Sequence, residues 1–131
     1  MRLMLDTNMV SYFLRGDVVV TKHVLNQPMS SLCISAITEG ELLFGLAKRP
    51  EATRLHAAVH EFLRRVEALP WDSSAAEYYA TARADLEKLG RTVSSIDLLI
   101  GSHALSIDAT LVTNDQAFSQ ISGLRVEDWA R

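Results

Sequence analysis

Short apolar runs along the chain predict the strands of a sheet. Three runs are clear: residues 2–6 (RLMLD), 31–35 (SLCIS) and 109–113 (ATLVT). Two weaker candidates are residues 66–71 (VEALPW) and 123–129 (GLRVEDW). These runs indicate a sheet of four to five strands.

Apolar residues at helical spacing fill the stretches between these runs. Over residues 51–66 the apolar side chains lie three and four positions apart, which marks one face of an amphipathic helix. A second such helix is predicted from about Ser73 to Leu89, with Gly90 as its end. Strands that alternate with helices favour a parallel sheet covered on both faces. We therefore expect an α/β fold in three layers, with a central, mostly parallel sheet of four to five strands flanked by helices.

The composition suits one domain, which we expect to span residues 1–131, because 48% of the residues are hydrophobic and no linker or repeat interrupts them. A single cysteine, Cys33, excludes an internal disulfide. No charged leader precedes a long apolar run, and no window approaches the length of a membrane span. We expect a cytoplasmic protein without membrane contact.

The net charge is weak evidence against an RNA partner. The chain carries 13 Lys and Arg against 16 Asp and Glu, a formal net charge of -3, without the basic surface typical of many nucleic-acid-binding proteins. A metal-dependent nuclease needs a carboxylate pocket, however, and those acids lower the net charge without excluding a local basic rim. Six residues form the pool for such a rim: Arg15, Arg49, Arg64, Arg65, Lys88 and Arg91.

Acidic residues stand where an open α/β sheet binds its ligands, in the crevice outside the carboxyl ends of the strands. Asp6 ends the first apolar run, Asp115 follows the third, and Asp97 begins an apolar helical segment. Glu41 lies in the segment ITEGELLFG after the second run, where spacing alone does not choose between Glu39 and Glu41. These acids are candidates for one carboxylate pocket.

Each acid alone also has an ordinary structural explanation. Asp6 is a favoured helix N-cap, and Asp115 suits the first turn of a helix. Thr38 and Glu41 have the spacing of a capping box, and Asp97 stands in the same relation to the serine three residues before it. Capping is the more frequent role for any one of them.

Helix capping does not explain why these acids occur together. Asp97 shares a helix face with Ile100 and Ala104, so its carboxylate faces apolar packing. Half-buried acids in one crevice repel one another unless a cation holds them. Oxygen ligands without Cys or His at matching spacing favour a hard ion, Mg²⁺, for which Mn²⁺ can substitute.

Five segments follow one another in a recognisable order: MLDTN, ITEGELLFG, GRTVSSIDLLIGSHAL, TLVTNDQAF and GLRVEDW. In this order the chain resembles the PIN-domain ribonucleases, and in particular the VapC-type toxins of bacterial toxin–antitoxin modules. The resemblance covers nearly the whole chain and implies a PIN-like three-layer fold.

The resemblance assigns catalysis to four acids: Asp6, Glu41, Asp97 and Asp115. It chooses Glu41 over Glu39, and it implies that the metal ligands are the three aspartates: Asp6, Asp97 and Asp115. Asn8 and Thr113 match polar residues that support the pocket. Many relatives carry a further aspartate where this chain has Ala117, so Asp115 is the only acid of its segment and is either a ligand itself or a support for the others.

The function implied by the resemblance is that of a magnesium-dependent endoribonuclease toxin of a type II toxin–antitoxin pair. Such enzymes hydrolyse structured RNA by in-line attack of water and leave a 5′ phosphate and a 3′ hydroxyl. The most similar toxins cut tRNA in the anticodon stem-loop, so tRNA is the expected substrate.

The segment at residues 11–25 is unusually apolar for the first helical hairpin of so small a domain. A groove for an amphipathic partner helix would use this excess. The resemblance implies a VapB-type antitoxin as the partner, packed against Tyr12, Val18 and Val19, and a homodimer within a higher toxin–antitoxin assembly. A symmetric dimer contact and ordinary core packing explain the same residues equally well.

Two other functions stay open from the sequence. A non-catalytic PIN-like module that binds RNA or protein would keep the fold, although the three best-matched acids are all present. An aspartyl-phosphate phosphatase would need a second acid two residues after the first, where this chain has Asn8.

The histidines are expected to be structural. His103 shares an apolar helix with Asp97, and no second histidine is spaced to join it at a metal. His56 and His60 have a spacing that can chelate a metal, but no acid completes the site.

Overall fold

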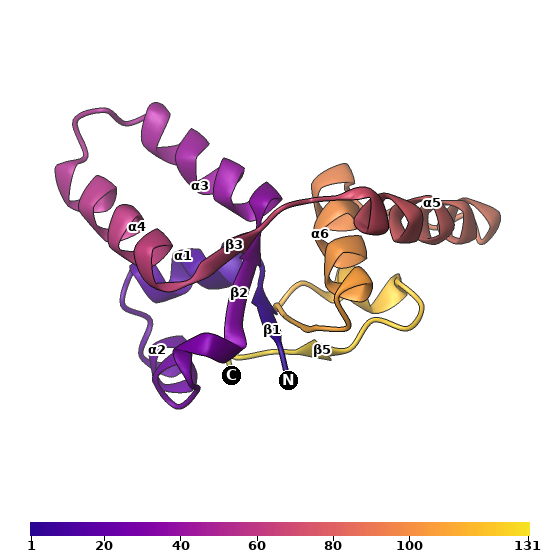
Figure 1. Cartoon of the computed structure of the whole chain (residues 1–131), viewed down its shortest axis with the longest axis horizontal. Helices are drawn as coiled ribbons and strands as arrows, with labels where there is room; N and C mark the ends of the chain where they lie inside the picture. Colours follow the sequence, from indigo (N-terminus) through magenta and orange to yellow (C-terminus); the bar gives the residue numbers. More distant parts are fainter.

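Five parallel strands form the centre of the computed structural model, which describes residues 1–131 (Figure 1). The strands are β1 (Leu3–Leu5), β2 (Leu32–Ser35), β3 (Glu67–Leu69), β4 (Thr110–Val112) and β5 (Val126–Glu127). They lie in the order β3-β2-β1-β4-β5, and every neighbouring pair is parallel. Each predicted apolar run contains one of these strands, so the predicted sheet is confirmed.

Six α-helices connect and cover the strands: α1 (Thr7–Leu14), α2 (Val18–Leu25), α3 (Ala36–Ala47), α4 (Thr53–Arg65), α5 (Ser73–Lys88) and α6 (Ser95–Ser106). Two short 3₁₀ helices are η1 (Met29–Ser31) and η2 (Gln116–Gln120). The predicted amphipathic helices correspond to α4 and α5, and Gly90 follows α5 with a positive φ of 66° that suits a helix end. None of these helices has the length and apolar character needed to cross a membrane.

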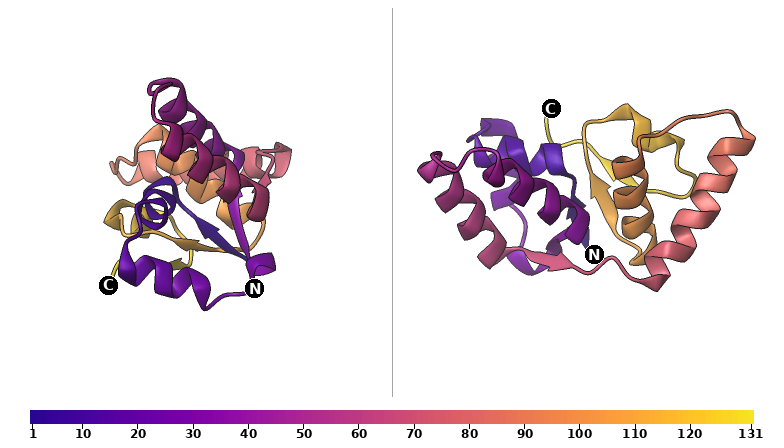
Figure 2. Two further views of the ribbon diagram at one scale, coloured as in Figure 1. Left: turned by 90° about the vertical axis from the view of Figure 1, so that its left-hand side faces the viewer. Right: turned by 90° about the horizontal axis from the view of Figure 1, so that it is seen from above.

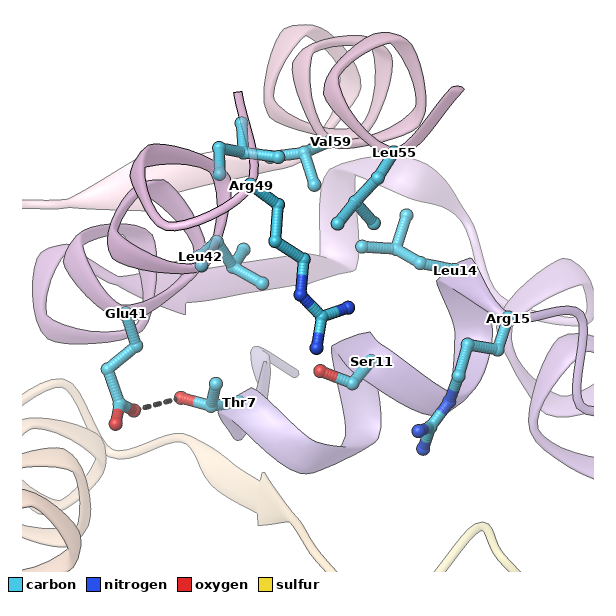
Figure 3. Close-up of a pocket in the computed structure, with 11 residues that line it drawn as sticks. Thr7, Ser11, Leu14, Arg15, Glu41, Leu42, Arg49, Leu55 and Val59 are labelled. Atoms are coloured by element: carbon cyan, nitrogen blue, oxygen red, sulfur yellow. Dashed lines mark hydrogen bonds between the residues drawn. The ribbon is translucent and has the colours of Figure 1, made fainter. Parts of the chain in front are cut away.

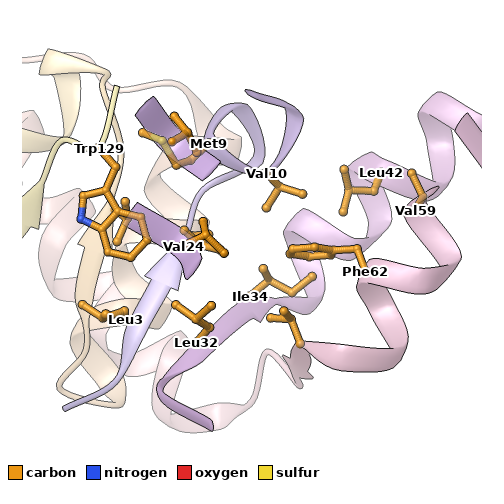
Figure 4. Packing of buried hydrophobic residues seen from close by; sticks show 14 of the residues in the cluster. Leu3, Met9, Val10, Val24, Leu32, Ile34, Leu42, Val59, Phe62 and Trp129 are labelled. Atoms are coloured by element: carbon orange, nitrogen blue, oxygen red, sulfur yellow. The ribbon is translucent and has the colours of Figure 1, made fainter. Parts of the chain in front are cut away.

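The helices cover both faces of the sheet, as predicted. Helices α1 to α4 lie on one side of the strands and α5 and α6 on the other (Figures 1 and 2). Successive residues of β1 alternate between the two faces. Leu3 and Leu5 join the core under α1 to α4, which also holds Phe62 and Trp129 (Figure 4), whereas Met4 joins the core under α5 and α6. The fold therefore has three layers.

The strand order reverses between β1 and β4, which creates a crevice at their carboxyl ends. From β1 the chain builds β2 and β3 on one side, and it then returns to build β4 and β5 on the other. The backbone N–H of Asp6 donates to the carbonyl of Val112 at 3.1 Å, so the pairing of β1 with β4 continues past the strand end. Open α/β sheets bind their ligands at such a reversal. Asp6 and Thr113 follow the two strands at this position.

A pair of glycine substitutions tests the packing of α6. A Cβ at Gly101 would lie 2.6 Å from Cδ1 of Ile121, which is itself buried, whereas a Cβ at Gly40 in α3 would meet nothing within 4 Å. We expect Gly101→Ala to lower the free energy of unfolding by about 1 kcal/mol because the core there is already filled. Gly40→Ala should raise it by roughly 0.5 kcal/mol through helix propensity alone. Urea unfolding measures both, and a gain in stability at both positions would contradict this packing.

Candidate active site

Asp6 is the most buried acid at the crevice, with 4% of its surface exposed. Its backbone is extended, and its Oδ1 accepts from the N–H of Met9 at 2.8 Å, so Asp6 is the N-cap of α1. Its Oδ2 accepts from the hydroxyl of Thr113 at 2.5 Å. The capping role anticipated for Asp6 is thus confirmed, and it leaves the same carboxylate at the floor of the crevice.

Thr113 connects the ends of the two central strands. Its Oγ1 donates to Asp6 and accepts from the backbone N–H of Asp115 at 3.0 Å. Asp115 in turn caps η2 by accepting from the N–H of Ala117 at 2.9 Å. Thr113 therefore fixes Asp6 directly and Asp115 through its backbone.

Asp97 lies in the first turn of α6. The helix begins after Ser94, whose hydroxyl accepts from the backbone N–H of Asp97 at 3.2 Å. This is the capping arrangement anticipated from the spacing of the two residues. Because only one turn separates Asp97 from the helix start, its half-buried carboxylate remains at the mouth of the crevice.

Glu41 comes from a third element, α3. Its Oε1 accepts from the hydroxyl of Thr7 at 2.5 Å, and the same hydroxyl lies 3.2 Å from that of Thr38. The capping box predicted for Thr38 and Glu41 is wrong: Ser35 caps α3 by accepting from the N–H of Ile37, and Thr38 is buried inside the helix. Thr7, which sequence reasoning passed over although it stands in MLDTN, is the residue that holds Glu41.

These residues surround a hollow of about 190 Å³ at the carboxyl end of the sheet. It is lined by Asp6, Thr7, Asn8, Glu41, Ser94, Ile96, Asp97 and Ile100. Asn8 is exposed at its rim, whereas Asp115 and Glu39 are not among the residues that line it. Of the two glutamates left open by spacing, the hollow contains Glu41.

The carboxylates perturb one another. Burial raises the pKa of Asp6 to about 6; the hydrogen bonds from Thr113 and Met9 lower it in part, and the charges of Asp97 and Asp115 raise it further. The pKa of Asp97 is also raised, first by burial and then by the charges of Asp115 and Glu41, against a lowering by Ser94. Acids from four separate segments therefore share one electrostatic environment.

The side chains that could bind a metal fit a hard divalent cation, because every polar side chain around the hollow carries an oxygen atom. Only Asn8 also carries a nitrogen, in its amide. As they stand, no three His, Cys, Asp or Glu side chains anywhere in the chain form a group ready to hold a metal ion. One oxygen of Asp6 is bonded to Thr113 and one of Glu41 to Thr7. Binding would require the carboxylates to turn toward one another, which their mutual repulsion opposes without a cation.

The histidines lie outside this hollow. His103 is buried, its Nδ1 is 2.7 Å from Oγ of Ser35, and burial lowers its pKa against a smaller opposite effect of Asp72. The packing role predicted for His103 is confirmed. His56 has its Nε2 2.9 Å from the carbonyl oxygen of Arg49, and its ring centroid is 6.5 Å from that of His60.

The apolar residues considered for partner binding do not form one surface. Val18 is 79% exposed and Val19 is 40% exposed at the start of α2, where they line a hollow with Lys22, His23, Asn26 and Arg131. Tyr12 packs against the core, and its hydroxyl accepts from Nδ2 of Asn114 at 3.2 Å. Val20 and Val24 are buried, so core packing accounts for part of the apolar excess of this segment.

Comparison with known proteins gives consistent matches over the whole chain. Residues 3–124 match the family model of the PIN domain. The chain is 33% identical over 131 residues to the tRNA(fMet)-specific endonuclease VapC of Shigella flexneri, with 99% of each chain covered. It is 35% identical over 130 residues to the protein of the same name from Salmonella typhimurium, with 98% of each covered.

Solved structures agree with these matches. The chain superimposes on a chain of the DNA-bound VapBC complex from Salmonella typhimurium with a TM-score of 0.91, at 35% identity and 98% coverage of each chain. For VapBC2 of Rickettsia felis bound to a DNA fragment from its promoter, the TM-score is 0.89 at 32% identity, with 98% of this chain and 99% of that chain covered.

The shared environment of the acids predicts a stability that depends on pH. In the unfolded chain the pKa of Asp6 returns to its ordinary value near 3.8, below the folded value of about 6. The folded protein therefore binds more protons than the unfolded one between these values, and stability falls as pH rises from about 4 to 7. Asp6→Asn keeps the cap and removes the charge, so without metal at pH 7 we expect it to be more stable than the parent by about 1 to 3 kcal/mol.

Urea unfolding in EDTA at several pH values measures this difference, with Asp108→Asn as the control. Asp108 is exposed in a turn with a φ of 54°, a conformation that asparagine also adopts, so it undergoes the same chemical change outside the hollow. Added Mg²⁺ should raise the melting temperature of the parent and of Asp108→Asn more than that of Asp6→Asn. An identical dependence on pH and metal in all three proteins would show that Asp6 shares no site with the other acids.

Proposed function

This chain belongs to the PIN-domain family of VapC ribonuclease toxins, and we propose that it cleaves RNA at the hollow formed by Asp6, Glu41 and Asp97, with the charge of Asp115 close to them. The observation that carries this assignment is the meeting of these acids, from four segments, at the reversal of the strand order. Helix capping explains where Asp6 and Asp115 stand, but it does not require their charges to face those of Asp97 and Glu41.

Mg²⁺, for which Mn²⁺ can substitute, is the proposed cofactor, in keeping with a nuclease family that is typically metal-dependent. Asp6, Asp97 and Asp115 are the proposed ligands, with Glu41 beside them. When bound, the ion would activate a water for in-line attack on a phosphodiester and neutralise charge on the phosphoryl oxygens and the leaving 3′ oxygen. The expected products are a 5′ phosphate and a 3′ hydroxyl.

The residues around the acids have positioning roles in this proposal. Thr113 and the backbone N–H of Met9 each donate to one oxygen of Asp6 and so hold that carboxylate at the floor of the hollow. Thr7 donates to one oxygen of Glu41, and Ser94 holds the start of α6 beneath Asp97. Asn8, exposed at the rim, is placed to donate its amide to the RNA backbone.

The proposed substrate is tRNA, cut in the anticodon stem-loop. Relatives from Shigella flexneri and Salmonella typhimurium, matched over nearly their whole length, are named tRNA(fMet)-specific endonucleases. An unpaired loop also offers the accessible backbone that a hollow at a sheet edge needs, because bases in a loop can be splayed apart.

The proposed partner is an antitoxin of the VapB type. Several solved relatives are VapBC complexes, and two of them are bound to DNA. We place part of the contact on Val18 and Val19, since both are exposed on one helix end and line a common hollow. Tyr12 lies in the preceding helix α1 and packs against the core, so it would contribute only its exposed part. A homodimer within a larger toxin–antitoxin assembly completes the proposal.

Removing a proposed ligand tests the catalytic assignment. Asp97→Asn and Asp6→Asn should each lower the rate of tRNA cleavage by roughly a factor of 100 or more, because water activation and charge compensation are lost together. Cleavage in Mg²⁺, followed on denaturing gels with an EDTA blank, measures the rate. Asp108→Asn should cleave at the parent rate.

Full activity of either ligand variant would overturn the assignment, and tight RNA binding by a parent that never cleaves would support a non-catalytic module instead. His103→Ala should retain cleavage at low temperature, although the loss of a buried side chain lowers its melting temperature.

A charge placed on α2 tests the partner surface. Val18→Asp and Val19→Asp should each weaken the antitoxin complex by about tenfold or more, because an unpaired charge is buried on association. Asp near the N-terminus of a helix is compatible with its dipole, so the fold should persist. Co-purification and titration calorimetry measure the complex. Leu89→Asp, an exposed apolar residue at the end of α5, is the control; equal affinity of all three variants would refute the surface.

A further inference from the structure

A second hollow opens directly beside the acids, between α1, α3 and α4 (Figure 3). Its volume is about 210 Å³. Thr7 and Glu41 line both hollows, so the two are neighbours, with the hydrogen bond between these two side chains on their common border. The floor is apolar and the rim is polar, with two arginines and no acid other than Glu41.

The arginines of this hollow are Arg15, at the end of α1, and Arg49, just after α3. Figure 3 shows Glu41 and Thr7 at one end, Arg49 reaching toward Ser11 in the middle, and Arg15 at the far end of α1. Neither guanidinium forms an ion pair. The guanidinium of Arg15 lies 5.3 Å from the centre of the Tyr12 ring, which keeps it on the surface of α1.

The other basic candidates are placed differently. Arg64 and Arg65 both pair with Glu61, at 3.0 and 2.7 Å, on the exposed side of α4. Lys88 ends α5, on the opposite side of the sheet. Arg91 lines a separate hollow beside α5. Of the predicted pool, only Arg15 and Arg49 are free of acids and share a hollow with the candidate site.

We propose that Arg15 and Arg49 form the track for the RNA backbone, binding phosphates on one side of the scissile bond while the acids act on the bond itself. This rests on the proposed function of the acidic hollow. Two arginines without an ion pair outnumber the single carboxylate of Glu41 in this hollow and favour an anionic occupant, and a polynucleotide supplies a phosphate at every residue. Arginine suits this role because its planar guanidinium can donate two hydrogen bonds to one phosphate.

The electrostatics also assign different parts of the bound strand to the two hollows. The acidic hollow repels phosphates without a cation, whereas the adjoining hollow attracts them. A strand that enters along α1 would therefore bind first at Arg15 and Arg49 and then pass its next phosphodiester to the acids. The apolar floor, formed by Leu14, Leu42, Leu46, Leu55 and Val59, could receive a base that has left its stack.

The test measures RNA affinity and cleavage separately. Anisotropy of labelled initiator tRNA in EDTA, over a series of KCl concentrations, gives Kd and its salt dependence; initial rates in Mg²⁺ give kcat and KM. We expect Arg15→Gln and Arg49→Gln each to raise Kd and KM roughly tenfold and to reduce the slope of log affinity against log salt by about 1, with kcat little changed. Arg15→Lys and Arg49→Lys should keep the slope. Arg64→Gln is the matched control and should bind like the parent.

The outcomes separate this inference from the proposed function. A parent that cleaves while Arg15→Gln and Arg49→Gln keep its Kd and salt slope would overturn the track and leave the catalytic assignment standing. An equal loss of RNA affinity in Arg64→Gln would show that RNA binds to a diffuse basic surface and not specifically to Arg15 and Arg49. Variants that lose affinity for the antitoxin but not for RNA would show that a protein segment occupies the hollow. A parent that neither binds nor cleaves RNA would refute the proposed function itself.

Discussion

The hydrogen bond from Thr113 to Asp6 is the interaction on which the candidate site depends. It joins the residues that follow β1 and β4, the two strands between which the sheet order reverses. The same threonine oxygen accepts from the backbone of Asp115, so one hydroxyl holds two acids in place. Because both bonds are buried or half-buried, water does not compete strongly for them. The position of Asp6 is thereby set by the sheet rather than by a loop.

Bringing these acids together costs electrostatic free energy in the folded protein. Each acid has a local role that stabilises the fold, as a cap or as a hydrogen-bond acceptor, yet together they raise the pKa of Asp6 and Asp97. A protein selected only for stability would replace one of these carboxylates by an amide, which caps a helix equally well. Retaining the charges is typical of functional sites, where activity opposes stability. A cation or a cationic partner side chain would relieve the repulsion.

The sequence predicted the layers well because its signals were local. Apolar runs marked all five strands, and helical spacing with Gly90 marked α5 within a residue or two of its ends. Local signals failed where the choice depended on a distant element. Thr38 had the spacing of a cap, but the chain leaves β2 one turn earlier and Ser35 takes that role. Arg15 and Arg49 could not be singled out from the basic pool, since their shared hollow joins segments that are far apart in sequence.

The parallel pairing of β1 with β4 also sets when the protein becomes competent during synthesis. Met4 is made at the start of the chain, but its partner Leu111 leaves the ribosome only after more than a hundred further residues. Asp6 cannot meet Thr113 or Asp115 before that moment, although α1 to α4 can already fold around β1 and β2. A nascent chain, or one cut short before β4, therefore lacks both the hydrogen bond from Thr113 to Asp6 and the carboxylate of Asp115. For a toxin, this delays activity until translation is nearly finished.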